Sequence, residues 1–294
     1  MAHNALSNTF LYCLAPIEGY TDNAFRTLCY RHGADLTFTE MARLDALVRR
    51  NASTWERTTL LNDTPTVIQL IGNKEEQLAK FLSQFSDKKE SNFSDKNESK
   101  LSNFQGFNLN IACPSPQFVK LGLGCAMIKR VAKVQKLVEV IKNKGYKASI
   151  KMRLGLNKYE LDKKAYLNII KNVDADYFVV HARHGADTYE NKTHDEVYEE
   201  CVAKGKTIIA NGDIDSVEKV EKLKSVGVKG VMIGKPAIQN PAIFDLLKNK
   251  SVPSFDALKK EYLEITKKLN SNHAYMSAVL RYMGASEQMK RVYN

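Results

Sequence analysis

A cysteine and an asparagine lie close together near the middle of the chain, and their thiol and amide side chains could both take part in a reaction. Cys113 directly follows residues 106–112, GFNLNIA, in which alternate positions are apolar as in a buried strand. Two prolines come next and end the strand, because proline cannot continue a hydrogen-bonded ladder. Asn110 and Cys113 are therefore expected at a strand tip, where an amide and a thiol suggest a site. On this stretch alone the pattern favours a buried structural thiol, since free cysteine is among the most buried residue types.

Two later segments carry side chains that could bind an electron-rich group. Lys151 lies between apolar neighbours, so its ammonium is expected to be nearly buried, which is costly without an anionic partner. A cofactor ring that becomes anionic on reduction would supply that partner. A Schiff-base lysine is the alternative, because some aldolases carry one on a barrel strand. His181 ends another apolar segment and is a candidate donor to the same ligand.

Two glycine-bearing turns could hold a phosphate. They contain Asn211, Gly212 and Asp213 in one case and Gly234 and Lys235 in the other. Backbone N–H groups of such turns bind anions, and Lys235 would add a positive charge. Ordinary strand-to-helix turns are the alternative. The two turns, however, follow the last two expected strands, and in a TIM barrel the loops after these strands often bind a phosphate.

These residues can form one site only in a fold that brings the ends of several strands close together. The chain alternates short apolar segments with helical patterns, as such a fold requires. Helices are expected at 160–172 and 215–226, for example, with Asp215 as the N-cap of the second and Gly227 as its stop. Strands buried on both faces and joined by helices favour a parallel sheet. The expected strands are residues 11–15, 35–41, 66–72, 107–112, 148–154, 177–182, 207–214 and 230–234.

Eight such units in roughly 240 residues predict an α/β fold of the (β/α)8 TIM-barrel type, with a doubly wound open sheet as the alternative. Active-site groups of a TIM barrel sit at the C-terminal ends of its strands. Nearly every expected end carries a group that can form hydrogen bonds or bear charge, which predicts a site at that face. In chain order these ends carry Pro16, Glu40, Gln69, Asn110 with Cys113, Lys151 with Arg153, His181 with Arg183, Asn211 with Asp213, and Gly234 with Lys235.

Composition narrows the class of partner. The 294 residues include 44 Lys and Arg against 33 Asp and Glu, a formal net charge of +11. That excess favours a polyanion such as nucleic acid, although a generally lysine-rich chain would explain it too. The five cysteines form no CxxC pair or zinc-ligand spacing, so no metal site is expected and reduced thiols of a cytoplasmic protein fit best. No signal peptide or membrane-spanning run is recognisable, and the oligomeric state cannot be read.

Two segments fall outside the expected barrel. Residues 86–103, SDKKESNFSDKNESKLSN, nearly duplicate one polar octamer and predict a disordered or loosely helical insertion. The tail beyond residue 249 has helical patterns dotted with Lys and Arg, which a solvated face or an RNA-facing surface would explain. The sequence thus predicts a barrel domain at 1–245, interrupted by the insertion at 86–103, and a small helical domain at 246–294.

A series of motifs, each at an expected strand tip, resembles the tRNA-dihydrouridine synthase family from Leu14 to about Phe244. Any one of them is weak, but their number and order make the resemblance strong. The motifs are APIEGYTD at 15–22 with FR at 25–26, TEM at 39–41, VIQLIG at 67–72, NLNIACP at 108–114, IKMR at 150–153, VHAR at 180–183, ANGDI at 210–214 and MIGK at 232–235 followed by NP at 240–241.

The resemblance implies an FMN-dependent enzyme that reduces the C5–C6 double bond of particular uridines in tRNA, with NADPH as the reductant. It implies that Cys113 is the general acid and that Asn110 and Arg183 contact the substrate. The helical domain would bind tRNA. The residues that would hold FMN are Pro16, Ile17, Glu18, Gln69, Lys151, His181, Asn211, Gly212, Asp213, Gly234 and Lys235.

The chain departs from the family pattern in three places. Ala112 stands where glycine is usual, Lys235 stands where arginine is usual, and the tail after Phe244 matches weakly. Two other functions remain open at this point. A flavin enzyme of the dihydroorotate or dihydropyrimidine type would act on a free base and would not need the basic charge. A non-catalytic RNA-binding barrel would lack flavin.

Overall fold

The computed structural model describes residues 9–91 and 103–285. Within them, nine strands form one sheet in the order β1-β9-β8-β7-β6-β5-β4-β2, with β3 also paired to β4, and every pairing is parallel. The strands are β1 (Leu11–Leu14), β2 (Thr37–Phe38), β3 (Ala42–Arg43), β4 (Thr66–Ile71), β5 (Phe104–Ile111), β6 (Ala148–Met152), β7 (Tyr177–His181), β8 (Ile208–Asn211) and β9 (Gly230–Ile233).

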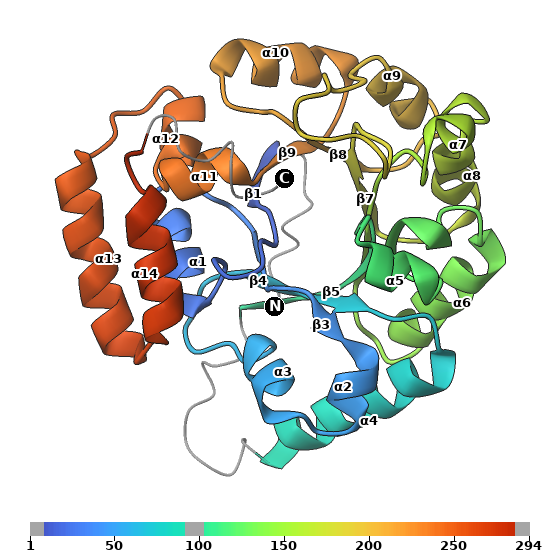
Figure 1. Cartoon of the computed structure of the whole chain (residues 1–294), viewed down its shortest axis with the longest axis horizontal. Helices are drawn as coiled ribbons and strands as arrows, with labels where there is room; N and C mark the ends of the chain where they lie inside the picture. Colours follow the sequence, from blue (N-terminus) through green and yellow to red (C-terminus); the bar gives the residue numbers. More distant parts are fainter. Residues whose placement is uncertain (1–8, 92–102, 286–294) are drawn as a thin grey trace.

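The sheet closes on itself. β1 pairs with β9 on one side, and on the other side the bridge between Cys13 and Leu36 joins it to the segment that leads into β2. The N–H of Leu14 donates to the carbonyl of Leu36 at 2.8 Å, and the Asp35 carboxylate accepts from the N–H of Tyr12 at 2.8 Å. The result is the predicted TIM barrel, viewed along its axis in Figure 1. The alternative of an open sheet is wrong.

The strand predicted at 35–41 is the main error of the sequence-based assignment. Two strands of two residues each, β2 and β3, replace it. Thr39 separates them because its hydroxyl, rather than a backbone carbonyl, accepts the hydrogen bond from the N–H of Gln69 at 3.0 Å. The strand ladder is thereby interrupted and Glu40 is carried into the loop between the two strands.

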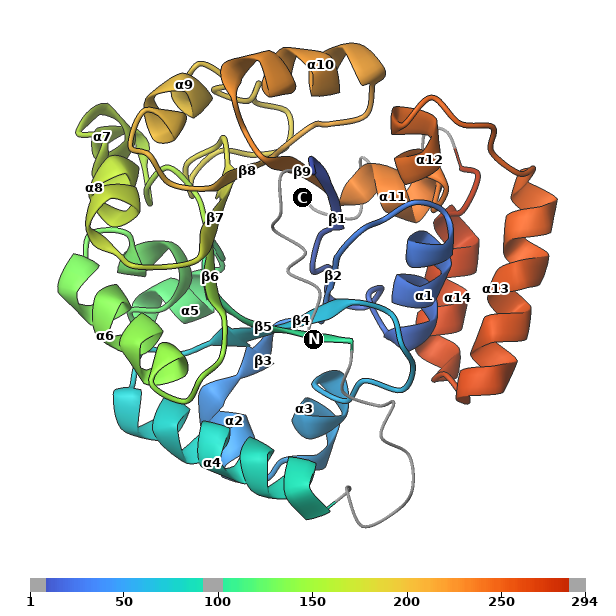
Figure 2. The same cartoon turned by 180° about the vertical axis from the view of Figure 1, so that it is seen from behind.

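Helices surround the strands on the outside of the barrel (Figures 1 and 2). They are α1 (Asn23–Arg31), α2 (Leu44–Val48), α3 (Ala52–Arg57), α4 (Glu75–Ser91), α5 (Pro116–Lys120), the 3-10 helix η3 (Gly124–Met127), α6 (Val131–Lys142), α7 (Lys158–Asp162), α8 (Ala165–Asn172), α9 (Val197–Val202), α10 (Val217–Val226), α11 (Lys235–Gln239), α12 (Ile243–Leu247), α13 (Phe255–Leu269) and α14 (His273–Tyr282).

Two helix predictions need correction. The helix predicted at 160–172 is broken in two, because Lys164 adopts a left-handed conformation with φ of 52° between α7 and α8. The N-cap of α10 is Ser216 and not Asp215, since the Ser216 side chain accepts the hydrogen bond from the N–H of Lys219. Gly227 ends that helix at φ 96°, as predicted.

The apolar residues form two cores. A small inner core fills the barrel and includes Cys13, Val67, Val179, Ile209 and Met232. A much larger outer core lies between the strands and the surrounding helices. The two cores follow from strand alternation, because successive side chains point to opposite faces of a sheet.

The C-terminal helices pack beside α1, as Figure 2 shows from behind. The ring of Tyr262 on α13 meets that of Phe25 on α1 edge to face at 6.5 Å between centroids. A helical C-terminal region is thus present, while the predicted boundary at residue 245 stays a prediction. Of the predicted insertion at 86–103, residues 86–91 continue α4 and Asn103 is buried. Residues 92–102 lie outside the described residues.

Candidate functional site

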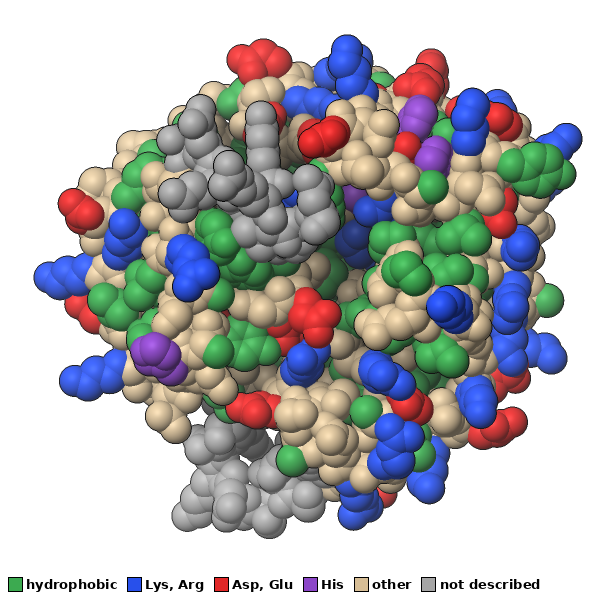
Figure 3. Space-filling view, viewed as in Figure 1, with side chains coloured by type: hydrophobic (Ala, Val, Ile, Leu, Met, Phe, Trp, Pro, Cys, Tyr) green, Lys and Arg blue, Asp and Glu red, His purple; other side chains and the backbone are tan. Residues whose placement is uncertain are grey.

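The inward-facing side chains at the C-terminal ends of the strands are polar. Residues paired in a parallel sheet share a face, and Lys151 pairs with Val179, a member of the inner core. Asn110 pairs with Lys151, and Asn211 pairs with Met232 of the same core. These three side chains therefore point into the barrel, above its apolar filling. In Figure 3 the face on which α5 and α11 begin is hollowed at its centre, with basic side chains deep inside and hydrophobic ones along one rim.

A chain of amide side chains crosses the barrel interior. Gln69 donates through Nε2 to Oδ1 of Asn108 at 2.8 Å and accepts from Nδ2 of Asn110 at 2.9 Å. Asn108 in turn donates to the Ser149 hydroxyl at 2.8 Å. Gln69 and Asn110 were predicted site residues, whereas Asn108 was missed. Its two-residue spacing from Asn110 on a buried strand was a signal, since both must face the barrel interior.

Asn110 also fixes the backbone that presents Cys113. Its Oδ1 accepts from the N–H groups of Ala112 and Cys113 at 2.9 and 3.0 Å. The carbonyl of Cys113 then accepts from the N–H of Cys125 at 3.0 Å. Gly124 allows this contact, because a Cβ there would lie 2.2 Å from that carbonyl oxygen and the φ of Gly124 is 57°. The strand tip and the start of η3 are thereby locked together.

The thiol of Cys113 is partly exposed, whereas the other four cysteines are buried. Partial burial raises the pKa of the Cys113 thiol above its ordinary value of 9.0, although nearby Arg153 and Lys151 oppose the shift. The thiol is therefore protonated at neutral pH. A partly exposed, protonated thiol could donate a proton, and its partial exposure differs from the full burial that its own stretch of sequence favoured.

Lys151 and His181 experience an electropositive, desolvated environment. Burial, and then the Arg153 charge, lower the pKa of Lys151 to about 8. Burial, and then the Lys151 charge, hold the pKa of His181 well below 6.5, so its imidazole is neutral at pH 7. Among the described residues, none forms a hydrogen bond or ion pair with the Lys151 ammonium. An electron-rich or anionic ligand would relieve this accumulation of positive charge.

The turns after β8 and β9 present backbone donors. No described residue accepts a hydrogen bond from the N–H of Gly212, Asp213 or Gly234. Gly212 lies against the His181 ring, where a Cβ would come within 2.9 Å of Cδ2, and its φ is 123°. The Asn211 side chain is used internally, donating to the carbonyl of Met232 at 2.9 Å. These N–H groups, with Lys235 next to Gly234, suit a phosphate.

Arg183, predicted to contact substrate, is almost fully engaged within the protein. Its side chain is 1% exposed, and its Nη1 and Nη2 donate to the Asp213 carboxylate at 3.0 and 2.5 Å. Nε and Nη2 also donate to the carbonyl of Asn191 at 3.1 and 2.5 Å. The ring of Tyr189 lies 5.8 Å from the Arg183 guanidinium and 3.3 Å from the Lys235 ammonium. Arg183 thus holds the β7–α9 loop around Tyr189, and its contact with substrate stays a prediction.

The loop after β1 contains the predicted cofactor residues Pro16, Ile17 and Glu18. Ile17 packs against the inner core, so the loop begins at the barrel mouth. The carboxylate of Glu18, by contrast, is largely exposed and accepts from Nη1 of Arg57 at 3.1 Å. If Glu18 contacts a cofactor, the backbone is therefore the better candidate than the side chain.

In the described part of the chain, no group of three or more His, Cys, Asp or Glu side chains could hold a metal ion. The same residues contain no helix long and apolar enough to cross a membrane. The expected site residues that do converge, namely Gln69, Asn110, Cys113, Lys151, His181 and the two turns, come from six strands of the barrel. Fold and site together define a TIM-barrel protein with a cluster of polar and basic side chains at the C-terminal ends of its strands.

Comparison with known proteins agrees with this class. Residues 13–293 match the family described as Dihydrouridine synthase (Dus), and the chain belongs to that family. A probable tRNA-dihydrouridine synthase of Helicobacter pylori is 32% identical over 260 residues, which cover 84% of this chain and 73% of that protein. The tRNA-dihydrouridine synthase B of Pseudomonas aeruginosa is 28% identical over 240 residues, covering 79% and 67%.

Among solved structures, a variant of NCR from Zymomonas mobilis is similar in fold. It superposes with a TM-score of 0.50 at 10% identity and covers 86% of this chain and 93% of its own. At that identity the likeness concerns the fold alone. The family assignment therefore comes from the sequence comparisons, and it agrees with the resemblance that the strand-tip motifs indicated.

Proposed function

We propose that this protein is a tRNA-dihydrouridine synthase that uses FMN and NADPH to reduce the C5–C6 double bond of specific uridines in tRNA. The observation that carries the proposal is the position of Cys113, a protonated and partly exposed thiol fixed by Asn110 beside Lys151. The names of the family and of its relatives, together with the net charge of +11, support tRNA as the substrate.

The residues at the barrel mouth fit FMN. Lys151 offers an ammonium without a counter-charge among the described residues, which suits the electron-rich part of a flavin ring. The open N–H groups of Gly212, Asp213 and Gly234, with Lys235, would hold its phosphate. His181 lies between these two regions, and Gln69 and the 16–18 segment would border the ring. The Asn211 side chain would support the phosphate site indirectly, because it joins the end of β8 to β9 below the two turns.

When bound and reduced by NADPH, FMN would supply a hydride to C6 of the uracil ring. Cys113 holds a proton on Sγ and would give it to C5, which would complete the reduction to dihydrouridine. Asn110 keeps the thiol in place through the N–H of Cys113 and is expected to contact the uracil. The uridine must leave its base stack to reach this depth, and the helical region from residue 246 is expected to hold the rest of the tRNA.

Anaerobic flavin spectroscopy tests the proposal. The protein is loaded with FMN, reduced with NADPH and mixed with tRNA that lacks modifications, while the visible absorbance of the flavin is followed. Reoxidation by tRNA, but not by free uracil or orotate, is expected. Reoxidation by a free base instead would assign the protein to the free-base class, and a protein that binds tRNA but no flavin would be a non-catalytic binder.

The variant Cys113→Ala tests the role of the thiol. It is expected to retain flavin while tRNA-dependent reoxidation falls about 100-fold or more, because general acid catalysis is worth about that much. Cys201→Ala is the matched control, since Cys201 is buried on α9, away from the mouth. Unchanged turnover by Cys113→Ala would remove this residue as the acid.

A further inference from the structure

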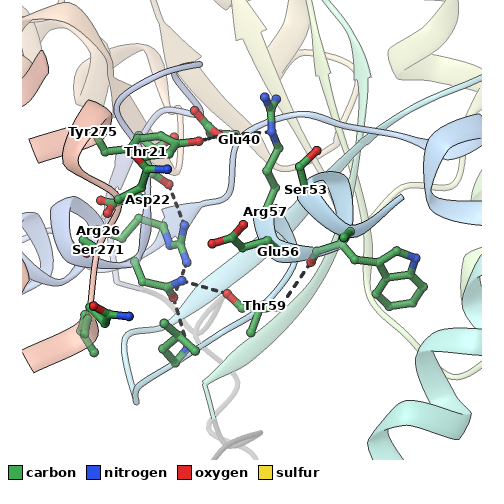
Figure 4. A pocket seen from close by; sticks show the side chains of 17 residues that line it. Thr21, Asp22, Arg26, Glu40, Ser53, Glu56, Arg57, Thr59, Ser271 and Tyr275 are labelled. Atoms are coloured by element: carbon green, nitrogen blue, oxygen red, sulfur yellow. Dashed lines mark hydrogen bonds and ion pairs between the residues drawn. The ribbon is translucent and has the colours of Figure 1, made fainter. Parts of the chain in front are cut away.

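The helical region meets the barrel across a polar cleft. The cleft has a volume of about 670 Å³ and is lined by α1, α3, Glu40 from the loop between β2 and β3, and the turn that joins α13 to α14 (Figure 4). Its side chains are of mixed charge and include Asp22, Arg26, Glu56 and Arg57. Because acidic and basic side chains are mixed, the cleft has no net positive charge that would favour binding of a phosphate. It does contain a buried carboxylate whose two oxygens both accept hydrogen bonds.

That carboxylate belongs to Glu40, which is 2% exposed. One oxygen accepts from the N–H of Gly19 and the other from the hydroxyl of Tyr275 on α14, the second at 2.5 Å. The guanidinium of Arg57 lies 3.6 Å from the same second oxygen. Burial raises the pKa of Glu40, while these hydrogen bonds and the Arg57 charge lower it. A buried carboxylate bonded on both oxygens fixes the groups around it.

The groups around Glu40 come from the loop after β1. Gly19 follows Glu18 in this loop, so Glu40 and Arg57 hold two consecutive residues of the segment expected to border the flavin. Gly19 has a φ of 79°, a left-handed conformation that favours glycine, and its N–H points to the Glu40 carboxylate. The far end of the loop is fixed as well, because Arg26 donates to the carbonyl of Thr21 at 2.6 Å.

Helix α14 touches this loop at two points. Tyr275, near its N-terminus, reaches Gly19 through Glu40. Tyr282, its last residue, packs its ring against that of Tyr20 with centroids 6.1 Å apart. Tyr20 directly follows Gly19. One face of α14 therefore supports two consecutive residues of the barrel mouth, Gly19 and Tyr20, from both ends of the helix.

We infer that Glu40 and Tyr275 are positioning residues. Together they link the position of helix α14 on the barrel to the conformation of the loop after β1. The inference rests on the proposed function, because it assigns to α14 a part in aligning bound tRNA with the reaction centre. Tyr275 fixes α14 to the carboxylate, and the carboxylate fixes the loop. Loss of the Tyr275 hydroxyl leaves the bond from Gly19 to Glu40 intact, whereas loss of the carboxylate removes both bonds.

Two variants separate these links. In Tyr275→Phe we expect unchanged flavin affinity, unchanged reoxidation by a small acceptor such as ferricyanide, and tRNA affinity within about threefold of wild type. The rate of reoxidation at saturating tRNA should fall about tenfold, the size of one lost charge-assisted hydrogen bond. In Glu40→Ala, flavin affinity, measured by quenching of flavin fluorescence, should fall about tenfold as well. Glu40→Gln should recover part of that loss, since its amide oxygen can still accept from Gly19.

Glu56→Gln is the matched control. Glu56 lines the same cleft, precedes Arg57 and is exposed, so neither flavin affinity nor the tRNA-dependent rate should change. A Tyr275→Phe variant as fast on tRNA as an active wild type would overturn the coupling alone. Equal losses with tRNA and with ferricyanide would also overturn it, because they would indicate general damage. A wild-type protein that cannot reduce tRNA would overturn the proposed function and, with it, the coupling.

Discussion

Replacing Lys151 with methionine should stabilise the flavin-free protein while weakening its hold on FMN. Lys151 faces the barrel interior from β6, next to Arg153, and no described residue forms an ion pair with it. Methionine keeps most of the length and volume of the side chain and removes its charge. The substitution therefore isolates the free energy of an uncompensated charge in the barrel mouth.

The size of the effect follows from the pKa of Lys151, which burial lowers from 10.5 to about 8. Each tenfold change in proton affinity equals about 1.4 kcal/mol, so the charged ammonium costs the folded protein at most about 3.5 kcal/mol at pH 7. Because the side chain is partly exposed, solvent reduces that figure. We expect Lys151→Met to raise the free energy of unfolding by about 1 to 3 kcal/mol.

The difference should vanish at high pH. Below pH 8 both the folded and the unfolded wild-type protein carry a protonated Lys151. Between pH 8 and 10.5 the unfolded chain binds the proton that the folded protein has lost, so this residue makes wild-type stability rise with pH. The Lys151→Met variant lacks that contribution. The stability advantage of the variant should therefore be largest at pH 7 and should shrink steadily toward pH 10.5.

Urea unfolding of the flavin-free proteins at several pH values measures this. The single tryptophan, Trp55, reports it, because its indole donates to the carbonyl of Leu47 at 2.9 Å and should change environment on unfolding. FMN binding, followed separately by fluorescence quenching, should be at least about tenfold weaker in the variant. A variant less stable than wild type, or an advantage that stays constant from pH 7 to 10, would refute the reasoning.

Three other predictions concern the loops around the reaction centre. Gly124→Ala should lower the free energy of unfolding by about 2 to 4 kcal/mol in urea titrations, since the new Cβ would meet the carbonyl of Cys113 at 2.2 Å and φ is 57°. Asp213→Asn should lower it by about 1 to 3 kcal/mol, because the buried guanidinium of Arg183 loses its charged partner; a variant of normal stability with weaker tRNA binding would instead favour Arg183 as a substrate contact. Loss of the Cys113 proton should lower the rate of tRNA-dependent flavin reoxidation only in a decline centred above pH 9.0, because burial raises the pKa of this thiol above that value; an alkaline decline in wild type that Lys151→Met does not remove and that is centred below pH 9.0 would indicate another proton donor.

Much of the barrel could be predicted because its signals are local. Alternation, glycine stops and short apolar runs placed seven of the eight predicted strands within a few residues of their observed ends. The eighth was wrong for a reason that lies far away in the chain. Thr39 breaks the ladder by bonding Gln69, thirty residues later, and no pattern within 35–41 reveals that partner.

The site divides in the same way. Residues within a strand, such as Asn110 and Lys151, face the barrel interior because side chains along a strand alternate between its two faces. Long side chains on loops are not fixed by this alternation. Arg183 turns to Asp213 and to the β7–α9 loop, and Glu40 finds Tyr275 after a separation of 235 residues. Such contacts depend on how distant loops pack and leave no periodic signal in the sequence.

The closure between β1 and β2 makes one seam of the barrel the natural place for local opening. Only a bridge between Cys13 and Leu36 and a few flanking hydrogen bonds join these edges, whereas β5 and β6 pair over five residues. Asp35 spans the seam below, through the N–H of Tyr12, and Glu40 spans it above, through the N–H of Gly19. In hydrogen exchange the amide of Leu14 should therefore exchange well before those of β6. A fluctuation that parts this seam would separate the loop after β1 from Glu40, so local opening of the barrel would loosen one wall of its mouth while α14 stays attached to α11 and α13.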